Sequence, residues 1–451
     1  MVTLGGLRNN LLLLVMSLYL LLNVGFMQVR IPPTAGSGIP IGELLLLFSL
    51  MTINYDTLLP RMSVVISLLP FIIWWALGLS CVLMSVPEYG FWAFRDANHV
   101  IESLFLVVGF AFAKHLQMLE RFFSWLKNTL ILVCIYAIGY PFKETLQSLS
   151  PKFTAGAGYE VPLLFNYTES SSVVLLAVGC YLLLPSSRVI LQPVVRYFTA
   201  TFLLGFTIFM FQARTIYLQV AAISLLFVCY RRRSFNRVIM IILVLFSFVV
   251  IMPTIGLQIK GRMREVSLEF FVNHFLAIAG VENEGVEGAA GGVPQRLDWW
   301  WDLYERWTSN TSTFLFGLGY GFPLINFKQH QGITVREPHN SYISIVARLG
   351  LSGGLAFVWM HILLLRVWYH TYKACGRMGW REGENRLLIL MIFFILVWVA
   401  AIGEDSFEKP YSTIPYYFFW GIVLRMNWHW GNNSPHSMLR VTGTQLREQF
   451  K

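Results

Sequence analysis

Long apolar runs follow one another along almost the whole chain, and short polar connections separate them. A helix that crosses a bilayer needs about 20 mostly apolar residues, and shorter helices occur near ends or kinks. By this criterion the pattern predicts about twelve transmembrane helices and an all-α polytopic membrane protein. The predicted spans are Asn10–Val29, Ile39–Asn54, Met62–Met84, His99–Ala113, Asn128–Phe142, Ser170–Pro185, Val194–Gln212, Thr215–Tyr230, Val238–Leu257, His339–Val367, Leu387–Ile402 and Tyr411–Met426.

The composition supports a membrane protein and excludes several other classes. Hydrophobic residues make up 56% of the 451 positions, and charged residues make up 13%. Soluble domains carry about 25% charged residues, so a soluble enzyme of this length could not cover its surface with so few. The basic residues behind the net charge of +10 lie between apolar runs, so we expect no nucleic-acid binding. The cysteines lie in predicted spans or in an inside loop, and they predict neither disulfides nor a metal site.

Lysine and arginine in the short connections predict the orientation of the chain. Such residues are retained on the cytoplasmic side of a membrane. With both termini inside, the basic stretches Arg231–Arg237 and Arg366–Arg386 are cytoplasmic, and one outside connection is much longer than the others. This large loop lies between spans 9 and 10. We therefore divide the chain into residues 1–257 with spans 1–9, the outside loop 258–338, residues 339–427 with spans 10–12, and an inside tail 428–451.

Part of the outside loop has the character of an interfacial helix. The stretch Gly280–Gly292 is rich in Gly and Glu and is typical of a linker. In the segment Gln295–Asn310, helical periodicity places Arg296 on the same face as Trp300 and Trp307. An interfacial helix alone would explain the tryptophans. A basic residue on the apolar face needs an anionic partner, so Arg296 is also a candidate binding residue.

Two other outside connections carry charges that the topology does not require. Arg214 lies in a connection of only a few residues between two apolar runs. Its planar guanidinium suits the oxygens of a diphosphate, although snorkelling of the side chain to the membrane surface would also explain it. Glu404 and Asp405 lie in the last outside turn. They could orient an imidazole or bind a sugar hydroxyl, or they could form a solvated turn.

His339 is the best-placed base on the outside, because it ends the long loop where the tenth span begins. An unperturbed histidine titrates near pH 6.5 and can accept a proton at neutral pH. The N-terminal end of a helix disfavours an imidazolium, so we expect a neutral ring. A lone histidine at such a position is also commonly a polar cap. The nearby Gly-rich stretch Phe316–Phe322 indicates by itself only a tight turn.

At these residues the chain resembles the O-antigen ligase/O-antigen polymerase superfamily of bacterial membrane glycosyltransferases. The first element of the likeness is Gln-Ala-Arg214-Thr-Ile-Tyr-Leu, and the second is Arg296-Leu-Asp-Trp followed by Phe-Gly-Leu-Gly-Tyr-Gly. The third is Pro-His339-Asn-Ser-Tyr-Ile, which leads into Arg348-Leu-Gly-Leu-Ser-Gly-Gly-Leu. Where this chain has Arg348, the family often has an acidic residue.

The resemblance implies a GT-C-like fold and a glycosyltransferase at the periplasmic face of the bacterial inner membrane. The donor would be a glycan linked to undecaprenyl diphosphate, and the acceptor would be the lipid A core. Transfer would invert the sugar centre and need no metal or other cofactor. In that picture His339 deprotonates or orients the acceptor hydroxyl, while Arg214 and Arg296 stabilise the departing diphosphate. Further candidates for acceptor binding, or for orienting the histidine, are Asn340, Tyr342, Glu404 and Asp405.

Alternative functions share many of these features. Within the superfamily, a polysaccharide polymerase or a protein O-glycosyltransferase would use the same donor and topology. We favour the ligase, but the sequence alone does not separate the three acceptors. A lipid-linked-glycan flippase or a secondary transporter is a different class with a similar number of spans. The ionisable residues Glu43, Glu102 and Arg348 inside predicted spans would suit a transporter, but no internal repeat accompanies them.

Overall fold

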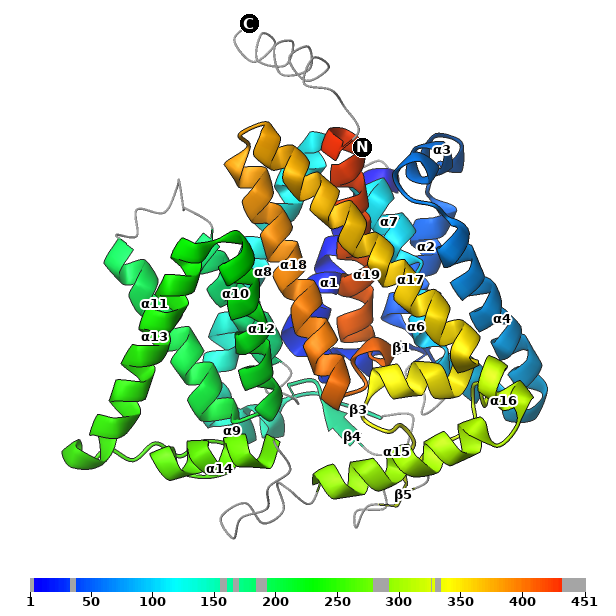
Figure 1. Cartoon of the computed structure of the whole chain (residues 1–451). Helices are drawn as coiled ribbons and strands as arrows, with labels where there is room; N and C mark the ends of the chain where they lie inside the picture. The colour runs from blue at the N-terminus through cyan, green and yellow to red at the C-terminus, as the bar shows by residue number, and fades with distance from the viewer. Residues whose placement is uncertain are drawn as a thin grey trace, which may run out of the picture.

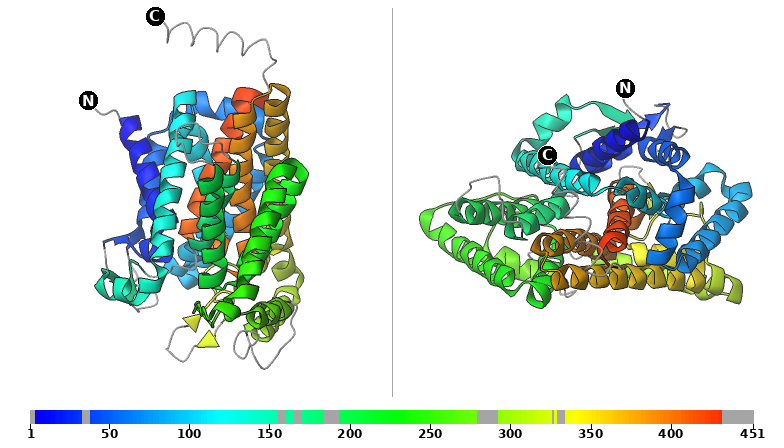
Figure 2. Two further views of the ribbon diagram at one scale, coloured as in Figure 1. Left: turned by 90° about the vertical axis from the view of Figure 1, so that its left-hand side faces the viewer. Right: turned by 90° about the horizontal axis from the view of Figure 1, so that it is seen from above.

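The structure, a computed structural model, is a bundle of helices that stand side by side (Figure 1). It describes residues 4–32, 38–154, 160–164, 170–183, 193–278, 292–325, 327–328 and 334–431. In the view from above, other helices lie around the C-terminal helix α19 (Pro410–Met426), which is buried along most of its length (Figure 2). A Cβ atom at Gly109 or Gly421 would meet backbone atoms of the facing helix at 2.1–2.2 Å. Small residues therefore let α7 (Phe105–Phe112) and α19 pack backbone to backbone.

The first part of the chain folds into helices and two short antiparallel hairpins. The hairpins pair β1 (Arg30–Ile31) with β2 (Ile39–Pro40), and β3 (Lys152–Thr154) with β4 (Glu160–Pro162). The remaining helices of this part are α1 (Leu4–Met27), α2 (Ile41–Met51), α3 (Tyr55–Val65), α4 (Leu69–Tyr89), α5 (Phe91–Asp96), α6 (Asn98–Glu102), α8 (Leu116–Ile138), α9 (Lys143–Leu149) and α10 (Ser170–Leu183).

The second part supplies the helices around the candidate site. One more hairpin pairs β5 (Phe327–Lys328) with β6 (Thr334–Val335). The helices are α11 (Pro193–Phe206) with a π-helical turn Thr207–Phe211, α12 (Arg214–Tyr230), α13 (Arg232–Ile251), α14 (Leu268–Ile278), α15 (Gly292–Thr308), α16 (Thr311–Phe316), α17 (Ser341–Arg377) and α18 (Arg381–Gly403). A short 3-10 turn, Ser406–Glu408, joins α18 to α19.

The helix lengths confirm an all-α polytopic membrane protein but change the number of spans. Among the described residues, 7 helices are long and apolar enough to cross a membrane, or 8 if the pair α2 and α3, bent by 103°, is one span. This is fewer than the about twelve predicted, although every predicted span contains helix. Apolar runs do not report where a helix breaks. The fourth run is split into α6 and α7, and α10, α12 and α19 have 17 or fewer residues.

The loop predicted to lie outside contributes α14, α15 and α16, which lie across one end of the bundle (Figure 1). The α12–α13 and α17–α18 connections lie at the opposite end, where α1 begins and α19 ends (Figure 1). At that end Arg231 forms an ion pair of 2.7 Å with Glu384 in the first turn of α18. The Gly-rich linker predicted between α14 and α15 lies mostly outside the described residues, as do residues 432–451 of the predicted tail.

Helix α17 is broken near its start, and this break positions the Gly-rich turn. Gly350 has φ 66° and ψ −169°, and a Cβ atom there would lie 2.4 Å from backbone atoms of Leu315. Across the break, the amides of Leu318 and Gly319 donate to the carbonyls of Ala347 and Arg348 at 2.7 and 3.2 Å. Only glycine fits at position 350 because its φ is positive and the neighbouring chain is in contact.

Candidate functional site

His339 is held in a strained backbone conformation immediately before α17. Its φ is 54°, which is uncommon for a residue other than glycine and costs about 1–3 kcal/mol. Both neighbours are fixed. The carbonyl of Pro338 accepts a hydrogen bond of 2.9 Å from the Trp300 indole on α15, and Asn340 caps α17 by accepting from the amides of Tyr342 and Ile343. The position of His339 is therefore set by α15 and α17 together.

Two carboxylates from the α18–α19 connection face the imidazole of His339. Its Nδ1 lies 3.3 Å from Asp405 Oδ2 and 3.8 Å from Glu404 Oε2. The Asp405 side chain is almost completely buried, whereas 47% of the Glu404 side chain is exposed. Because Nδ1 faces the carboxylates, the neutral ring carries its hydrogen on Nδ1. The lone pair of Nε2 can then accept a proton. This is the arrangement of an oriented general base.

The carboxylates also set the charge of the histidine. Asp405 raises the pKa of His339 above its ordinary value, against the lowering effect of burial. Burial would raise the pKa of Asp405, but the charges of His339, Lys409 and Arg296 hold it below its ordinary value. The expectation that the helix N-terminus keeps the ring neutral is therefore wrong in its direction, because a buried carboxylate in contact outweighs the helix dipole.

Arg296 joins α15 to the same connection. Its Nη1 donates a hydrogen bond of 3.0 Å to the carbonyl of Gly403, the last residue of α18. A Cβ atom on Gly403 would lie 3.9 Å from Arg296 Nη1 and 3.6 Å from the methyl group of Thr215 on α12. The ends of α12 and α18 and the start of α15 therefore converge at Gly403.

Arg214 is the first residue of α12, next to Thr215, and is partly buried. Its guanidinium is close enough to that of Arg296 for the two charges to interact, and Arg296 in turn interacts with His339. Like charges at such proximity repel, which favours an anion between them. The structure thus brings together Arg214, Arg296, His339, Glu404 and Asp405, which lie far apart in the sequence.

Gln212, two residues before Arg214, fixes the chain that leads to α14. It has a φ of 48°, and its Oε1 accepts from the amides of Met263 and Arg264 at 2.7 and 3.1 Å. Its Nε2 donates to the carbonyl of Arg264 at 2.9 Å. The Gln-Ala-Arg sequence therefore combines a residue that anchors the loop with a charged residue at the site.

The other two candidates have structural partners. Asn340 uses its side-chain oxygen to cap α17, and Tyr342 donates its hydroxyl hydrogen to the carbonyl of Trp398 at 3.0 Å. Both lie beside His339 in the chain, and these hydrogen bonds engage the side-chain oxygen of each residue. Through them, both residues hold the first turn of α17.

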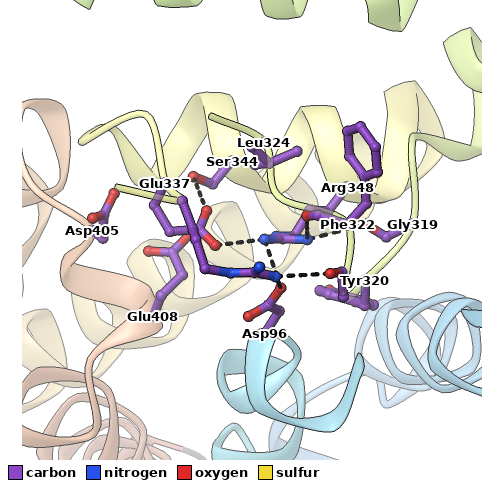
Figure 3. Close-up of polar contacts among 12 residues, drawn as sticks. Asp96, Gly319, Tyr320, Phe322, Leu324, Glu337, Ser344, Arg348, Asp405 and Glu408 are labelled. Atoms are coloured by element: carbon purple, nitrogen blue, oxygen red, sulfur yellow. Dashed lines mark hydrogen bonds and ion pairs between the residues drawn. The ribbon is translucent and has the colours of Figure 1, made fainter. Parts of the chain in front are cut away.

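Arg348, the departure from the family pattern, has a clear structural role. Its buried guanidinium forms ion pairs with Asp96 at 3.1 Å and with Glu337, and it donates to the carbonyls of Gly319 and Phe322, both at 3.2 Å (Figure 3). Arg348 thus binds the Gly-rich turn to α17. The amides of Leu318 and Gly319 already donate to α17, so the turn is a packing device and not a phosphate cradle.

Three residues near the site were not singled out from the sequence: the buried His274 and the partly buried Glu337 and Glu408. Glu337 pairs with Arg348, Glu408 Oε2 lies 2.5 Å from Ser341 Oγ, and His274 Nδ1 on α14 lies 3.2 Å from the Tyr217 hydroxyl. Burial and the charge of Arg214 lower the pKa of His274 to about 4, so this ring is neutral beside the arginine. The only sequence signal for Glu408 was its place in the same acidic turn as Glu404 and Asp405.

The fold and this cluster define a polytopic membrane protein with a basic and acidic site at one end of its helices. Residues 199–358 match a family model described as O-antigen ligase. The match confirms the resemblance to the O-antigen ligase superfamily and covers Arg214, Arg296 and His339. No curated protein matches the chain. Within the described ranges, no group of three or more His, Cys, Asp or Glu residues is arranged to hold a metal ion.

Proposed function

We propose that the protein is a glycosyltransferase that moves a glycan from undecaprenyl diphosphate to the lipid A core at the periplasmic face of the bacterial inner membrane. The family match indicates a ligase- or polymerase-like protein acting on lipid-linked glycans in a bilayer. The observation that carries the finer proposal is the contact of His339 with Asp405 beside two arginines. An acceptor hydroxyl needs a base, and a diphosphate leaving group needs positive charge. The site offers both.

The proposed reaction is a single displacement. Nε2 of His339 takes the proton of the acceptor hydroxyl while its oxygen bonds to the anomeric carbon of the donor glycan. The bond from that carbon to the diphosphate oxygen breaks, and its electron pair leaves with the diphosphate. The charge that grows there is stabilised by Arg214 and Arg296, and such preorganised stabilisation is usually the largest catalytic contribution. Attack opposite to the leaving group inverts the anomeric centre.

Asp405 and Glu404 have an orienting role in this scheme. A carboxylate against Nδ1 fixes the tautomer and stabilises the imidazolium that forms when the acceptor loses its proton. Asn340 and Tyr342 would contribute by holding the first turn of α17. No step requires a metal ion, because the two guanidinium groups compensate the leaving group's charge.

The transport alternative has less support than the transferase. Of the in-span charges that suited it, Arg348 is engaged by Asp96 and Glu337. Glu43 on α2 and Glu102 on α6 interact with each other. In the sequence, both lie far from Arg214 and His339. A polymerase and a protein O-glycosyltransferase remain alternatives of the same chemistry with other acceptors.

One assay tests the proposed acceptor. We expect purified protein, incubated with lipid-linked glycan and core lipid, to join the glycan to the core, and the acceptor end of the product identifies the function. A product that carries a second glycan on the lipid carrier would instead establish the polymerase. A product on a pilin-type protein would establish the protein O-glycosyltransferase. Translocation of the donor without any covalent product would contradict a transferase.

The proposed orientation predicts opposite labelling of two positions. In a cysteine-free background, Asp298→Cys on α15 should react with a membrane-impermeant thiol reagent added from the periplasmic side, because α15 lies at the site end. Asn236→Cys, near the α12–α13 connection at the other end, should react only after the inner membrane is opened. Both side chains are exposed, so reagent access differs only by side. Labelling of Asn236→Cys in intact spheroplasts would contradict the orientation.

A further inference from the structure

Glu408 is a buried carboxyl group beside the catalytic cluster for which the proposed reaction has no use. It ends the 3-10 turn Ser406–Glu408, between the residues that face His339 and the start of α19. Its Oε2 lies 2.5 Å from Ser341 Oγ, whereas its Oε1 is buried without a hydrogen-bond partner among the described residues. Among the described residues, the hydrogen bond of this carboxyl group is therefore the one with Ser341.

Ser341 connects Glu408 to the residues that orient the histidine. Its Oγ accepts a hydrogen bond of 3.0 Å from the amide of Phe407 and lies 3.3 Å from the carbonyl oxygen of Glu404. A serine hydroxyl has one hydrogen to donate and two lone pairs that accept. It can therefore donate to the Glu408 carboxylate or to the Glu404 carbonyl, but not to both at full strength.

The protonation state of Glu408 decides between these two arrangements. A neutral Glu408 donates its own hydrogen to Ser341 Oγ, and Ser341 is then free to donate to the Glu404 carbonyl. An ionised Glu408 takes the serine hydrogen and leaves that carbonyl without this donor. Glu404 and Asp405 are consecutive residues, so the hydrogen bond to the Glu404 carbonyl acts on the backbone that carries both carboxylates of the site.

The surroundings of Glu408 favour its neutral form. Asp405 and Glu337 face it with negative charge, and Lys409 is the nearby positive group. The hydroxyls of Tyr320, from the Gly-rich turn, and Tyr417, from α19, also interact with it. Figure 3 shows Glu408 on the same side of the network as Glu337 and Asp405. Burial, followed by the charges of Asp405 and Glu337, raises the pKa of Glu408 to about 8.

We propose that Glu408 is a positioning residue whose neutral form, acting through Ser341, holds Glu404 and Asp405 against His339. This inference rests on the proposed transferase function and adds a pH limit to it. Ionisation of Glu408 withdraws a hydrogen bond from the carboxylate-bearing turn and adds a buried negative charge beside Asp405. Both changes weaken the fixed orientation of the imidazole.

The first test is the pH profile of single-turnover transfer. Wild-type transfer should fall by up to about eightfold between pH 7.5 and 9, because the neutral fraction of a group that titrates near pH 8 falls by that factor. Glu408→Gln stays neutral at every pH, and its amide can donate to Ser341, so we expect this variant to keep the wild-type maximum and lose the alkaline fall. The matched control is Glu269→Gln on α14, which replaces an exposed carboxylate and should retain the fall. An unchanged alkaline fall in Glu408→Gln would overturn the proposal.

A second measurement separates this inference from the proposed function, since it requires no catalysis. The folded protein keeps the Glu408 proton above the ordinary value of 4.5, at which the unfolded chain loses it. The stabilisation is therefore complete below that value and is lost as pH rises towards 8. The melting temperature of wild type relative to Glu408→Gln should decline from pH 5 to 8 and then level off. A constant difference would contradict the neutral Glu408. A declining difference in a protein with no transfer to any acceptor would overturn the transferase function alone.

Discussion

Replacing His339 with alanine should lower the rate of glycan transfer by about 10²–10⁴-fold, because general-base catalysis contributes a factor of this size. His339→Gln should lose as much, since an amide cannot take the acceptor proton. Donor binding should change little in either variant, because the arginines hold the diphosphate. Single-turnover transfer and binding of the lipid-linked donor, measured on the same preparations, separate these effects.

The neighbours of His339 make the prediction more specific. Asp405 raises the pKa of the ring, so the transfer rate should increase with pH through a value above 6.5 as the imidazole loses its proton. Asp405→Asn removes this charge and should move the acidic limb of the profile to lower pH. His370→Ala, an exposed histidine at the other end of α17, is the matched control and should behave as wild type. Transfer by His339→Ala within a few-fold of wild type would mean that His339 is only a structural residue.

Much of the fold follows from the apolar runs, because every run predicted to cross the membrane contains helix, although some runs are broken into two helices. The predicted span Leu387–Ile402 lies inside α18, and the tenth span begins at α17 within two residues of the prediction. The run His99–Ala113 shows the limit. It contains Ser103 and Leu104 between α6 and α7, and no local pattern reveals that the helix breaks there. Breaks depend on packing between distant segments.

The sequence allowed us to predict which residues belong to the candidate site, but not how these residues interact. The predicted orientation placed Arg214, Arg296, His339, Glu404 and Asp405 on the same side of the membrane. The topology does not require polar or charged residues at these positions, which made them candidates. The charge of His339 was not predictable in this way, since it depends on the 3.3 Å separation from Asp405. The role of Arg348 was not predictable either, because it depends on the partners Asp96 and Glu337, which lie 252 and 11 residues away in the sequence.

Replacing Arg214 or Arg296 with alanine should lower the transfer rate by about 10²–10³-fold, the loss usually seen when one preorganised donor to a developing negative charge is removed. Unlike the loss of His339, this change should also weaken donor binding, because the diphosphate carries charge before the reaction as well as during it. Expression and membrane insertion should be preserved. The measurements are single-turnover transfer and donor affinity at fixed salt.

The two arginines should respond differently to lysine. A lysine keeps the charge but not the planar fork that binds two oxygens, so each Lys variant should recover only part of the lost rate. Arg296→Lys should recover less than Arg214→Lys if the Arg296 hydrogen bond to Gly403 also holds the turn that carries Glu404 and Asp405. Because the two charges act on one diphosphate, the double alanine variant should lose less than the product of the single losses. Arg262→Ala, an exposed arginine in the same outside segment, is the control. Full activity of Arg214→Ala would reduce that residue to an interfacial anchor, and strictly multiplicative losses would contradict a shared diphosphate.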